Sequence, residues 1–353
     1  MRARNVTRLR IVAGVTVASA ALGVVLAPQA GSLGIAGNGV VGGLIGSTLA
    51  AIEIALQGPA RASLQRFPVW LVFLLRVIIY GAVFIAAPEI VGAAAQLLAP
   101  SSERLPQFGL PASGAILAAI GFNAFFLARA LIGPSTLTAF ILGRYHRPRL
   151  EERLVLFLDL RGSTGLAERL GDLAFHRFLD RLAEDLTDPV VEAKGEIYRY
   201  VGDEIIISWP LTRGNEGGRA IACLPAIEDV LSDRRGQYLA EFGVIPQLRG
   251  ALHAGSLVVG EMGRHKREIV MLGDTMNTAA RIEEVCRQTG HDYIASAAAL
   301  RVAGPLSPGL HAEALGPMPL RGKEEQIELF ALSREPRAQR SDPGIAARDA
   351  AVA

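Results

Sequence analysis

Cysteine is scarce in this chain, and the two that occur, Cys223 and Cys286, lie far apart without a CxxC or Cys/His spacing. Neither a disulfide framework nor a zinc site is therefore indicated, and both are expected to be reduced core thiols. The chain also lacks an excess of either charge, since 36 Lys and Arg residues are balanced by 34 Asp and Glu residues. A dedicated nucleic-acid-binding protein needs a strong basic face, so we expect no nucleic-acid partner.

Charged residues are rare in the first 145 positions, and the mean hydropathy of the whole chain is positive, at +0.32. With 353 residues the chain is long enough for two or three domains. Four apolar stretches reach the length of about 20 residues that a bilayer crossing requires. They are 9–26, 33–56, 69–97 and 113–142. We therefore expect residues 1–143 to form a membrane domain of four helices in contact with the lipid bilayer.

The distribution of basic residues predicts the orientation of this domain. A cleaved signal peptide is the competing interpretation of 9–26, because a basic start precedes it and small residues follow. Four spans fit the charges better, since basic residues cluster before the first, between the second and third, and after the fourth. We expect an inner (plasma) membrane protein with both termini in the cytoplasm. Glu53 and Arg76 lie toward the cytoplasmic side and can pair. The sequence does not identify a membrane or extracytoplasmic ligand of this domain.

Beyond Arg149 the pattern becomes that of a water-soluble domain. We expect a short connector at 144–153, a catalytic domain at 154–333 and a disordered tail at 334–353. The expected order of elements, β-α-α-β-β-α-β with further strands, suits a ferredoxin-like α+β fold. Its sheet is expected to be rich in antiparallel pairs, with helices on one face.

Two aspartates stand at the ends of expected strands. Asp159 ends a buried strand over 154–160, and Asp203 lies at the tip of the hairpin "EIYRYVGDEIIISW". Neighbouring strands would bring the two carboxylates together. Next to them, the Arg161-Gly162 loop leads into a helix that Ser163 or Thr164 can cap. Carboxylates beside a helix N-terminus predict a site for hard divalent cations and a polyphosphate. Glu204 alternates to the face opposite Asp203 and is not expected to bind metal.

Four motifs, "LFLDLRGST", "YRYVGDEIIISW", "LRGALHAGSLVVGEMG" and "GDTMNTAARIE", occur in the order and spacing of the class III nucleotidyl cyclase catalytic domain, which residues 154–332 resemble. The resemblance implies a homodimer with two active sites, each built from both chains. It implies two Mg²⁺ ions per site, replaceable by Mn²⁺. The implied metal ligands are Asp159, Asp203 and the Leu160 carbonyl. Asn277 and Arg281 match the ribose-orienting and phosphate-stabilising residues of the partner chain. The implied phosphate-binding residues are Arg161, Gly162, Ser163, Thr164, Arg321 and Lys323.

The resemblance implies an adenylate cyclase that converts ATP to 3′,5′-cyclic AMP and pyrophosphate, with the membrane domain as a possible regulator. Arg199 occupies the position of the family's purine-selecting Lys and can donate to N1 of adenine, but Val270 at the partner position cannot accept from the amine. A guanylate cyclase and a degenerate membrane nucleotide sensor therefore remain alternatives. A diguanylate cyclase fits less well, because Val201 stands where that turn has its first Gly. A transport function is a further alternative, but no motif in the sequence indicates it.

Overall fold

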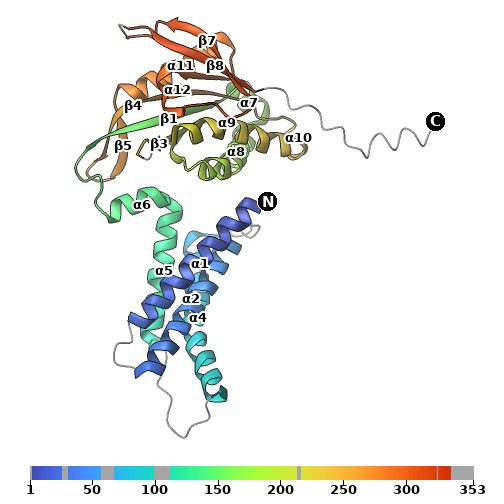
Figure 1. Ribbon diagram of the computed structural model, residues 1–353. Coiled ribbons are helices and arrows are strands. Elements are labelled where there is room, and N and C mark those ends of the chain that lie inside the picture. Colours follow the sequence, from blue (N-terminus) through green and yellow to red (C-terminus); the bar gives the residue numbers. More distant parts are fainter. Residues whose placement is uncertain are drawn as a thin grey trace, which may run out of the picture. The chain divides into compact units, whose positions relative to one another are not determined.

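The computed structural model describes residues 2–25, 31–56, 67–98, 112–212, 216–323 and 325–334. The chain divides into two compact units, Met1–Thr138 and Ala139–Ala353. Within the described ranges the first unit consists of helices, and the second contains the β-sheet (Figure 1). The tail expected at 334–353 lies outside the described residues except for Arg334.

The helical region follows the apolar stretches of the sequence. Its helices are α1 (Arg2–Val25), α2 (Gly31–Leu56), α4 (Val69–Leu98), α5 (Ala112–Ile132) and α6 (Pro134–Ile141). Two of them contain segments long and apolar enough to cross a membrane, Ile35–Leu56 and Val69–Leu97, with mean hydropathies of 1.8 and 2.4. The apolar parts of α1 and α5 are shorter, at Val12–Val25 and Ile116–Ile132. By length and composition, two of the four expected spans are therefore found among the described residues.

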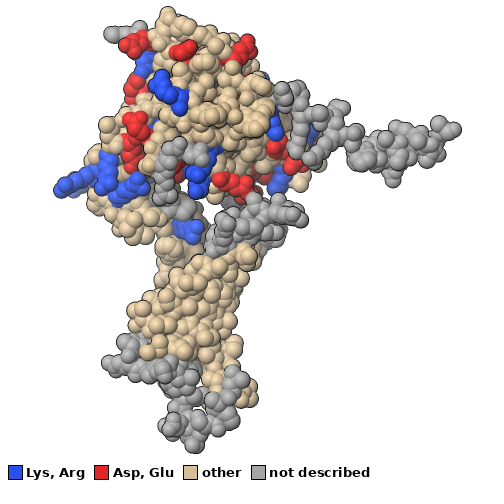
Figure 2. All heavy atoms as spheres, viewed as in Figure 1, with Lys and Arg blue, Asp and Glu red and all other residues tan. Residues whose placement is uncertain are grey.

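The fourth expected span, 113–142, is not one continuous helix. Gly133 separates α5 from α6 and has φ 92°, a conformation that glycine tolerates and other residues avoid. The predicted pairing between α2 and α4 is confirmed, because Arg76 Nη1 lies 3.2 Å from Glu53 Oε1. On the face shown in Figure 2, the charged side chains of the described residues gather on the sheet unit, whereas the helices present an uncharged surface.

The sheet unit contains eight strands in one mixed sheet. Seven run in the order β2-β3-β1-β4-β6-β8-β7, and β5 pairs with β4 off this path. Only the pair β4·β6 is parallel, so the expected antiparallel-rich sheet is found. The strands are β1 (Arg149–Leu160), β2 (Glu196–Val201), β3 (Glu204–Pro210), β4 (Leu248–Met262), β5 (Glu268–Leu272), β6 (Tyr293–Ser296), β7 (Leu310–Met318) and β8 (Ile327–Arg334).

Both faces of this sheet are buried, which corrects the expectation that helices cover one face. Alternate residues of β1 point to opposite sides: Leu154, Leu156 and Leu158 join one core, whereas Val155 and Phe157 join the other. Helices α8 (Asp172–Glu192), α9 (Glu216–Asp233) and α12 (Ala297–Ala303) contribute to the first core. Helix α11 (Asp274–Thr289) packs in the second. Asp159 continues the odd-numbered series of β1 and therefore lies on the α11 face.

The two helices expected between the first strand and the hairpin are found, and the single helix expected after the hairpin is divided into two. Gly171, with φ 74°, separates α7 (Ser163–Leu170) from α8, and α10 (Arg235–Phe242) follows α9. The hairpin predicted around Asp203 is confirmed as β2 and β3, and Gly202 adopts φ 64° in its turn. Strand β1 begins at Arg149, earlier than expected, because Arg149–Arg153 extend the antiparallel pairing with β4.

A buried arginine holds the first half of β1. Arg153 is 2% exposed, and its guanidinium lies 2.9 Å from carboxylate oxygens of both Glu151 and Glu196. It also donates to the Ser208 hydroxyl at 2.9 Å and to the Tyr145 hydroxyl at 3.3 Å. Burying a guanidinium is costly unless its donors are paired, and here they are paired on several sides. This network joins β1, β2 and β3 to the segment that precedes β1.

Replacing Arg153 is therefore expected to destabilise the sheet unit strongly. Arg153→Ala leaves Glu151 and Glu196 without their buried cation, which costs about 3 to 5 kcal/mol. We expect a markedly lower thermal unfolding midpoint of the purified full-length chain. Arg181→Ala is the control, because Arg181 forms an exposed 3.3 Å pair with Glu241 worth at most about 1 kcal/mol. Equal midpoints for the two variants would contradict the role assigned to Arg153.

Candidate active site

The first group of polar residues lies where β1, β4 and α11 meet. Asp159 pairs directly with Arg249 in the β1·β4 register. The Arg249 guanidinium donates to Asp159 Oδ2 at 2.6 and 2.8 Å, and its Nε lies 3.0 Å from Glu283 Oε1 of α11. Arg287 completes the chain of contacts at 2.9 Å from Glu283. The Arg249 guanidinium therefore fixes the Asp159 carboxylate in place and is itself held by Glu283 of α11.

Asp203 lies beside Asp159, as the expected strand order requires. Strands β1 and β3 are antiparallel neighbours, and Asp203 belongs to the turn that leads into β3. Burial raises the pKa of Asp203, and the nearby Asp159 carboxyl raises it further, whereas a hydrogen bond from the Ser163 hydroxyl lowers it. Two carboxyl groups held this close favour a cation between them.

Glu204 belongs to the same acidic group, contrary to the expectation that it points away. Burial and the charges of Glu283, Asp159 and Asp203 raise the pKa of Glu204 to about 7. Strand alternation does not hold across the turn, since Glu204 is already paired with Val201 as the first residue of β3. The acidic group therefore comprises four carboxyl groups, and two arginines, Arg249 and Arg287, contact it.

This donor set fits a magnesium ion held partly by substrate. Among the described residues, no group of three or more His, Cys, Asp or Glu side chains forms a complete metal site. Magnesium usually takes one or two carboxylates and fills its other positions with phosphate oxygens and water. Asp159 and Asp203 offer hard oxygen donors of this kind. The side chain of Leu160 is buried in the core, so only its main chain can contribute.

A second group of polar residues lies along α11 and the turn before β8. The Arg281 guanidinium lies against Gly322. A side chain at position 322 would place its Cβ only 3.3 Å from Arg281 Nη2. Next to it, Lys323 forms an ion pair with Asp274 at the start of α11. Asn277 lies one helical turn before Arg281 and is exposed. Arg281, Asn277 and Lys323 therefore form a basic and polar group separate from the acidic one.

Helix α11 presents these two groups on different sides. Arg281 and Glu283 are two residues apart, which corresponds to about 200° around a helix. Glu283 is buried and faces Arg249, whereas Arg281 faces Gly322. Asn277 and Arg281 share a face because they are four residues apart. Within one chain, Arg281 is directed away from the Asp159 side of α11.

The two positions expected to read the base lie on β2 and β5. Arg199 Nη2 is 2.7 Å from Glu268 Oε2, and its guanidinium lies 5.3 Å from the centre of the Tyr198 ring. Val270 is two residues after Glu268 and pairs with Gly260 of β4. The donor expected at Arg199 is therefore already accompanied by a carboxylate acceptor.

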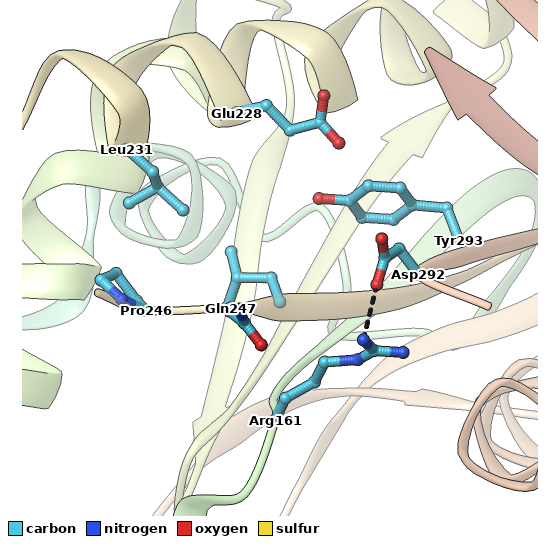
Figure 3. A pocket seen from close by; sticks show the side chains of 8 residues that line it. Arg161, Glu228, Leu231, Pro246, Gln247, Asp292 and Tyr293 are labelled. Atoms are coloured by element: carbon cyan, nitrogen blue, oxygen red, sulfur yellow. Dashed lines mark ion pairs between the residues drawn. The ribbon is translucent and has the colours of Figure 1, made fainter. Parts of the chain in front are cut away.

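Arg161 is engaged in a different direction from the one expected. Its guanidinium lies 3.0 Å from Asp292 Oδ1 and donates to the Gly290 carbonyl at 2.6 Å. Figure 3 shows this pair at a pocket of about 260 Å³ that is also lined by Glu228 and Tyr293.

Ser163 is the first residue of α7, which Gly162 precedes in the left-handed conformation without a side-chain cap. The expected cap by Ser163 or Thr164 is thus absent at this helix. Arg321 lies in the turn that contains Gly322.

Three residues of these groups were not expected from the sequence. Arg249, Glu283 and Glu268 gain their places from strand register and helix packing. The signal for Arg249 is present in "QLRGALHAG", but it becomes readable only when Asp159 and Arg249 are known to be cross-strand partners. A lone charged residue in a strand otherwise indicates a solvated position.

Comparison with known proteins gives a consistent result. No family model matches the sequence. A protein named adenylate cyclase 2, from Rhizobium meliloti (strain 1021), is 37% identical over 205 residues, which are 58% of this chain and 56% of that protein. An adenylate cyclase from Anabaena cylindrica is 26% identical over 180 residues, covering 50% of this chain and 36% of that protein. The chain thus spans about half the length, or less, of these curated relatives.

One solved structure supports the fold alone. A bacterial light-regulated adenylyl cyclase matches with a TM-score of 0.53 at 20% identity, over 63% of this chain and 64% of that one. Both sequence relatives are named as adenylate cyclases, and the solved structure has a similar fold. The family resemblance expected from the sequence is therefore confirmed.

His253 gives a test of the electrostatics around the second group. Burial, with a smaller contribution from Lys323, lowers the pKa of His253 to about 4. Ser296 Oγ accepts from the Ala299 amide and lies 2.8 Å from His253 Nδ1, so its proton is free to be donated to the neutral ring. A lowered pKa stabilises the fold above the ordinary value near 6.5, and this stability is lost as the pH falls toward 4.

We expect His253→Asn, which keeps an acceptor for Ser296, to reduce the loss of stability between pH 6.5 and pH 4. The difference from the wild type is up to roughly 3 kcal/mol, at about 1.4 kcal/mol per unit of pKa. Thermal unfolding of the full-length chain at both pH values measures it. His176→Asn is the control, since His176 is exposed on α8. An unchanged pH dependence in His253→Asn would refute the neutral buried ring.

Proposed function

We propose that this protein is a membrane-bound adenylate cyclase that converts ATP to 3′,5′-cyclic AMP and pyrophosphate at a homodimer interface. The observation that carries the proposal is the acidic group of Asp159 and Asp203, held by Arg249 and left with excess negative charge. Such a group is suited to the metal-bound triphosphate of a nucleotide. The choice of ATP draws on the relative named adenylate cyclase 2.

The separation of the two polar groups by α11 supports a shared site. Arg281 and Asn277 lie on one side of this helix, and Glu283, which contacts Arg249, lies on another. Two chains related by a two-fold axis offer each acidic group the partner's copy of α11. One dimer then has two equivalent sites, each with aspartates from one chain and Asn277 and Arg281 from the other.

The reaction is an intramolecular phosphoryl transfer in which the ribose 3′-oxygen attacks the α-phosphorus, loses its proton and displaces pyrophosphate. Asp159 and Asp203 would hold magnesium, which when bound would neutralise charge on the triphosphate and lower the pKa of the 3′-hydroxyl. Asn277 orients the ribose by hydrogen bonds, and Arg281 stabilises the charge that develops on the transferred phosphate. Arg321 and Lys323 bind the terminal phosphates. Phosphoryl transfer depends chiefly on positioning and charge stabilisation, which these residues supply.

The proposed organisation retains a membrane domain at 1–143 and a catalytic domain at 154–333. Four spans remain our proposal on the distribution of basic residues, whereas two helices meet the criteria of length and composition. Both termini would then lie in the cytoplasm, where ATP is available. An extracytoplasmic or membrane ligand could act on the enzyme through this domain.

Guanylate cyclase activity is the second candidate. Val270 lacks an acceptor for the adenine amine, and the neighbouring pair Arg199–Glu268 offers a donor and an acceptor that guanine can also use. Incubation of the purified chain with ATP or with GTP, each with Mg²⁺ and with Mn²⁺, and assay of both cyclic products separates the candidates. Cyclic AMP as the main product is the expected result.

The metal assignment predicts that Asp203→Ala lowers the turnover of ATP by at least about a thousandfold, because a ligand of the catalytic ion is removed. Assay of cyclic AMP with saturating Mg²⁺ or Mn²⁺ measures the loss, and thermal unfolding checks that the variant is folded. Asp233→Ala is the matched control, because Asp233 is an exposed acid at the end of α9. Full activity of Asp203→Ala would rule out the metal assignment.

The shared site predicts that two inactive variants complement each other. Chains with Asp203→Ala and chains with Arg281→Ala form mixed dimers in which one of two sites has every group. At equal mixing we expect about a quarter of the wild-type activity, since half of the dimers are mixed. The control mixes Asp203→Ala with Asp159→Asn, which affect the same group and should give no recovery. Absence of recovery in the first mixture, despite mixed dimers in a pull-down, would contradict the shared site.

A further inference from the structure

Strand β5 offers an acceptor that is not at the expected position. Val270 occupies the place where an acceptor for the base was sought, and its side chain is apolar. Ile269 and Met271 pack in the core next to α11, so the alternate residues Glu268 and Val270 face away from it. Side chains two positions apart on a strand share a face and are separated by about 7 Å. Glu268 is therefore on the face of Val270, one step along the strand.

Contacts from β2 bring Arg199 to this face. The β2·β3 register shifts between Ile197 and Arg199, so Tyr198 sits at a β-bulge. The Tyr198 hydroxyl accepts from the Met271 amide at 3.0 Å, which ties the bulge to β5. Bulges redirect side chains and are frequent beside active sites. In this arrangement the Arg199 guanidinium extends over the Tyr198 ring and ends 2.7 Å from Glu268.

Neither partner exhausts its hydrogen-bonding capacity in this pair. A guanidinium has five N–H donors, and only Nη2 of Arg199 is directed at Glu268. A carboxylate accepts at about four positions, of which Arg199 uses one on Oε2 and Lys266 one on Oε1. Both side chains are partly exposed, so a bound base can reach them. Together they present a donor next to an acceptor with little net charge, which suits the edge of a neutral purine.

We propose that Glu268, rather than residue 270, is the acceptor that selects the purine base in this protein. The Glu268 carboxylate accepts a hydrogen bond from the 6-amino group of adenine while Arg199 donates to N1. Glu268 at the same time holds the Arg199 guanidinium in the plane that the base requires. This inference rests on the proposed adenylate cyclase function and adds a specificity-determining residue outside the family's motif.

The test compares ATP with purine riboside 5′-triphosphate, which has the same ring and N1 but no 6-amino group. We expect the wild-type full-length chain to favour ATP in kcat/KM by about tenfold or more, as for a hydrogen bond to a charged group. In Glu268→Ala this preference should fall to within about twofold, because only ATP loses a bond. Glu268→Gln, which keeps one acceptor oxygen, should retain an intermediate preference.

The outcomes separate this inference from the proposed function. If wild-type protein forms no cyclic AMP, or prefers GTP, the proposed adenylate cyclase function fails and the adenine assignment falls with it. If it forms cyclic AMP but Glu268→Ala keeps the wild-type preference, or slows both substrates by the same factor, Glu268 does not contact the amine and only this inference is overturned. Glu261→Gln is the matched control, because Glu261 is an acid on the same hairpin opposite Ile269. It should keep the wild-type preference.

Discussion

The ion pair between Asp159 and Arg249 joins the elements on which the candidate site depends. It lies across the two central strands, β1 and β4, and extends through Glu283 to α11. Without a cation here, the four buried or half-buried carboxyl groups of the acidic group would repel one another at the end of the sheet. The pair fixes Asp159 beside Asp203, and through Glu283 it holds one face of α11 toward the sheet. That orientation in turn decides where Arg281 and Asn277 lie.

The acidic and basic groups of one chain are held apart by a rigid helix. No side-chain rotation carries Arg281 around α11 to the Asp159 side of the same chain, which supports the shared site proposed above. This arrangement also avoids an internal ion pair between the catalytic groups, which would neutralise both of them in the absence of substrate. Lys323 instead pairs with Asp274 at the start of α11. In the proposed function, a complete site therefore requires two chains.

The sequence predicted the features that depend on local pattern. The hairpin around Asp203 and the strand ending at Asp159 follow from strand patterning and turn chemistry, and their proximity follows from the expected fold, in which these strands are neighbours. Features set by register or by packing were missed. Arg249 became meaningful only through its cross-strand partner, Glu204 lies near the acids because a turn resets alternation, and the helices on the second face follow from the odd-numbered residues of β1. The break between α5 and α6 at Gly133 depends on a single positive φ angle within an apolar stretch.

The placement of Glu268 two residues before Val270 bears on how substrate preference evolves in such enzymes. On a strand, a functional group can move by two positions and still face the same ligand, provided that the opposite side chain has the reach to meet it. Arg199, longer than a lysine and redirected by the bulge at Tyr198, has that reach. Recognition of the base is then a property of a surface shared by β2 and β5. An alignment that compares only single columns would class this chain as degenerate, whereas our proposal places the acceptor two positions earlier on the same strand.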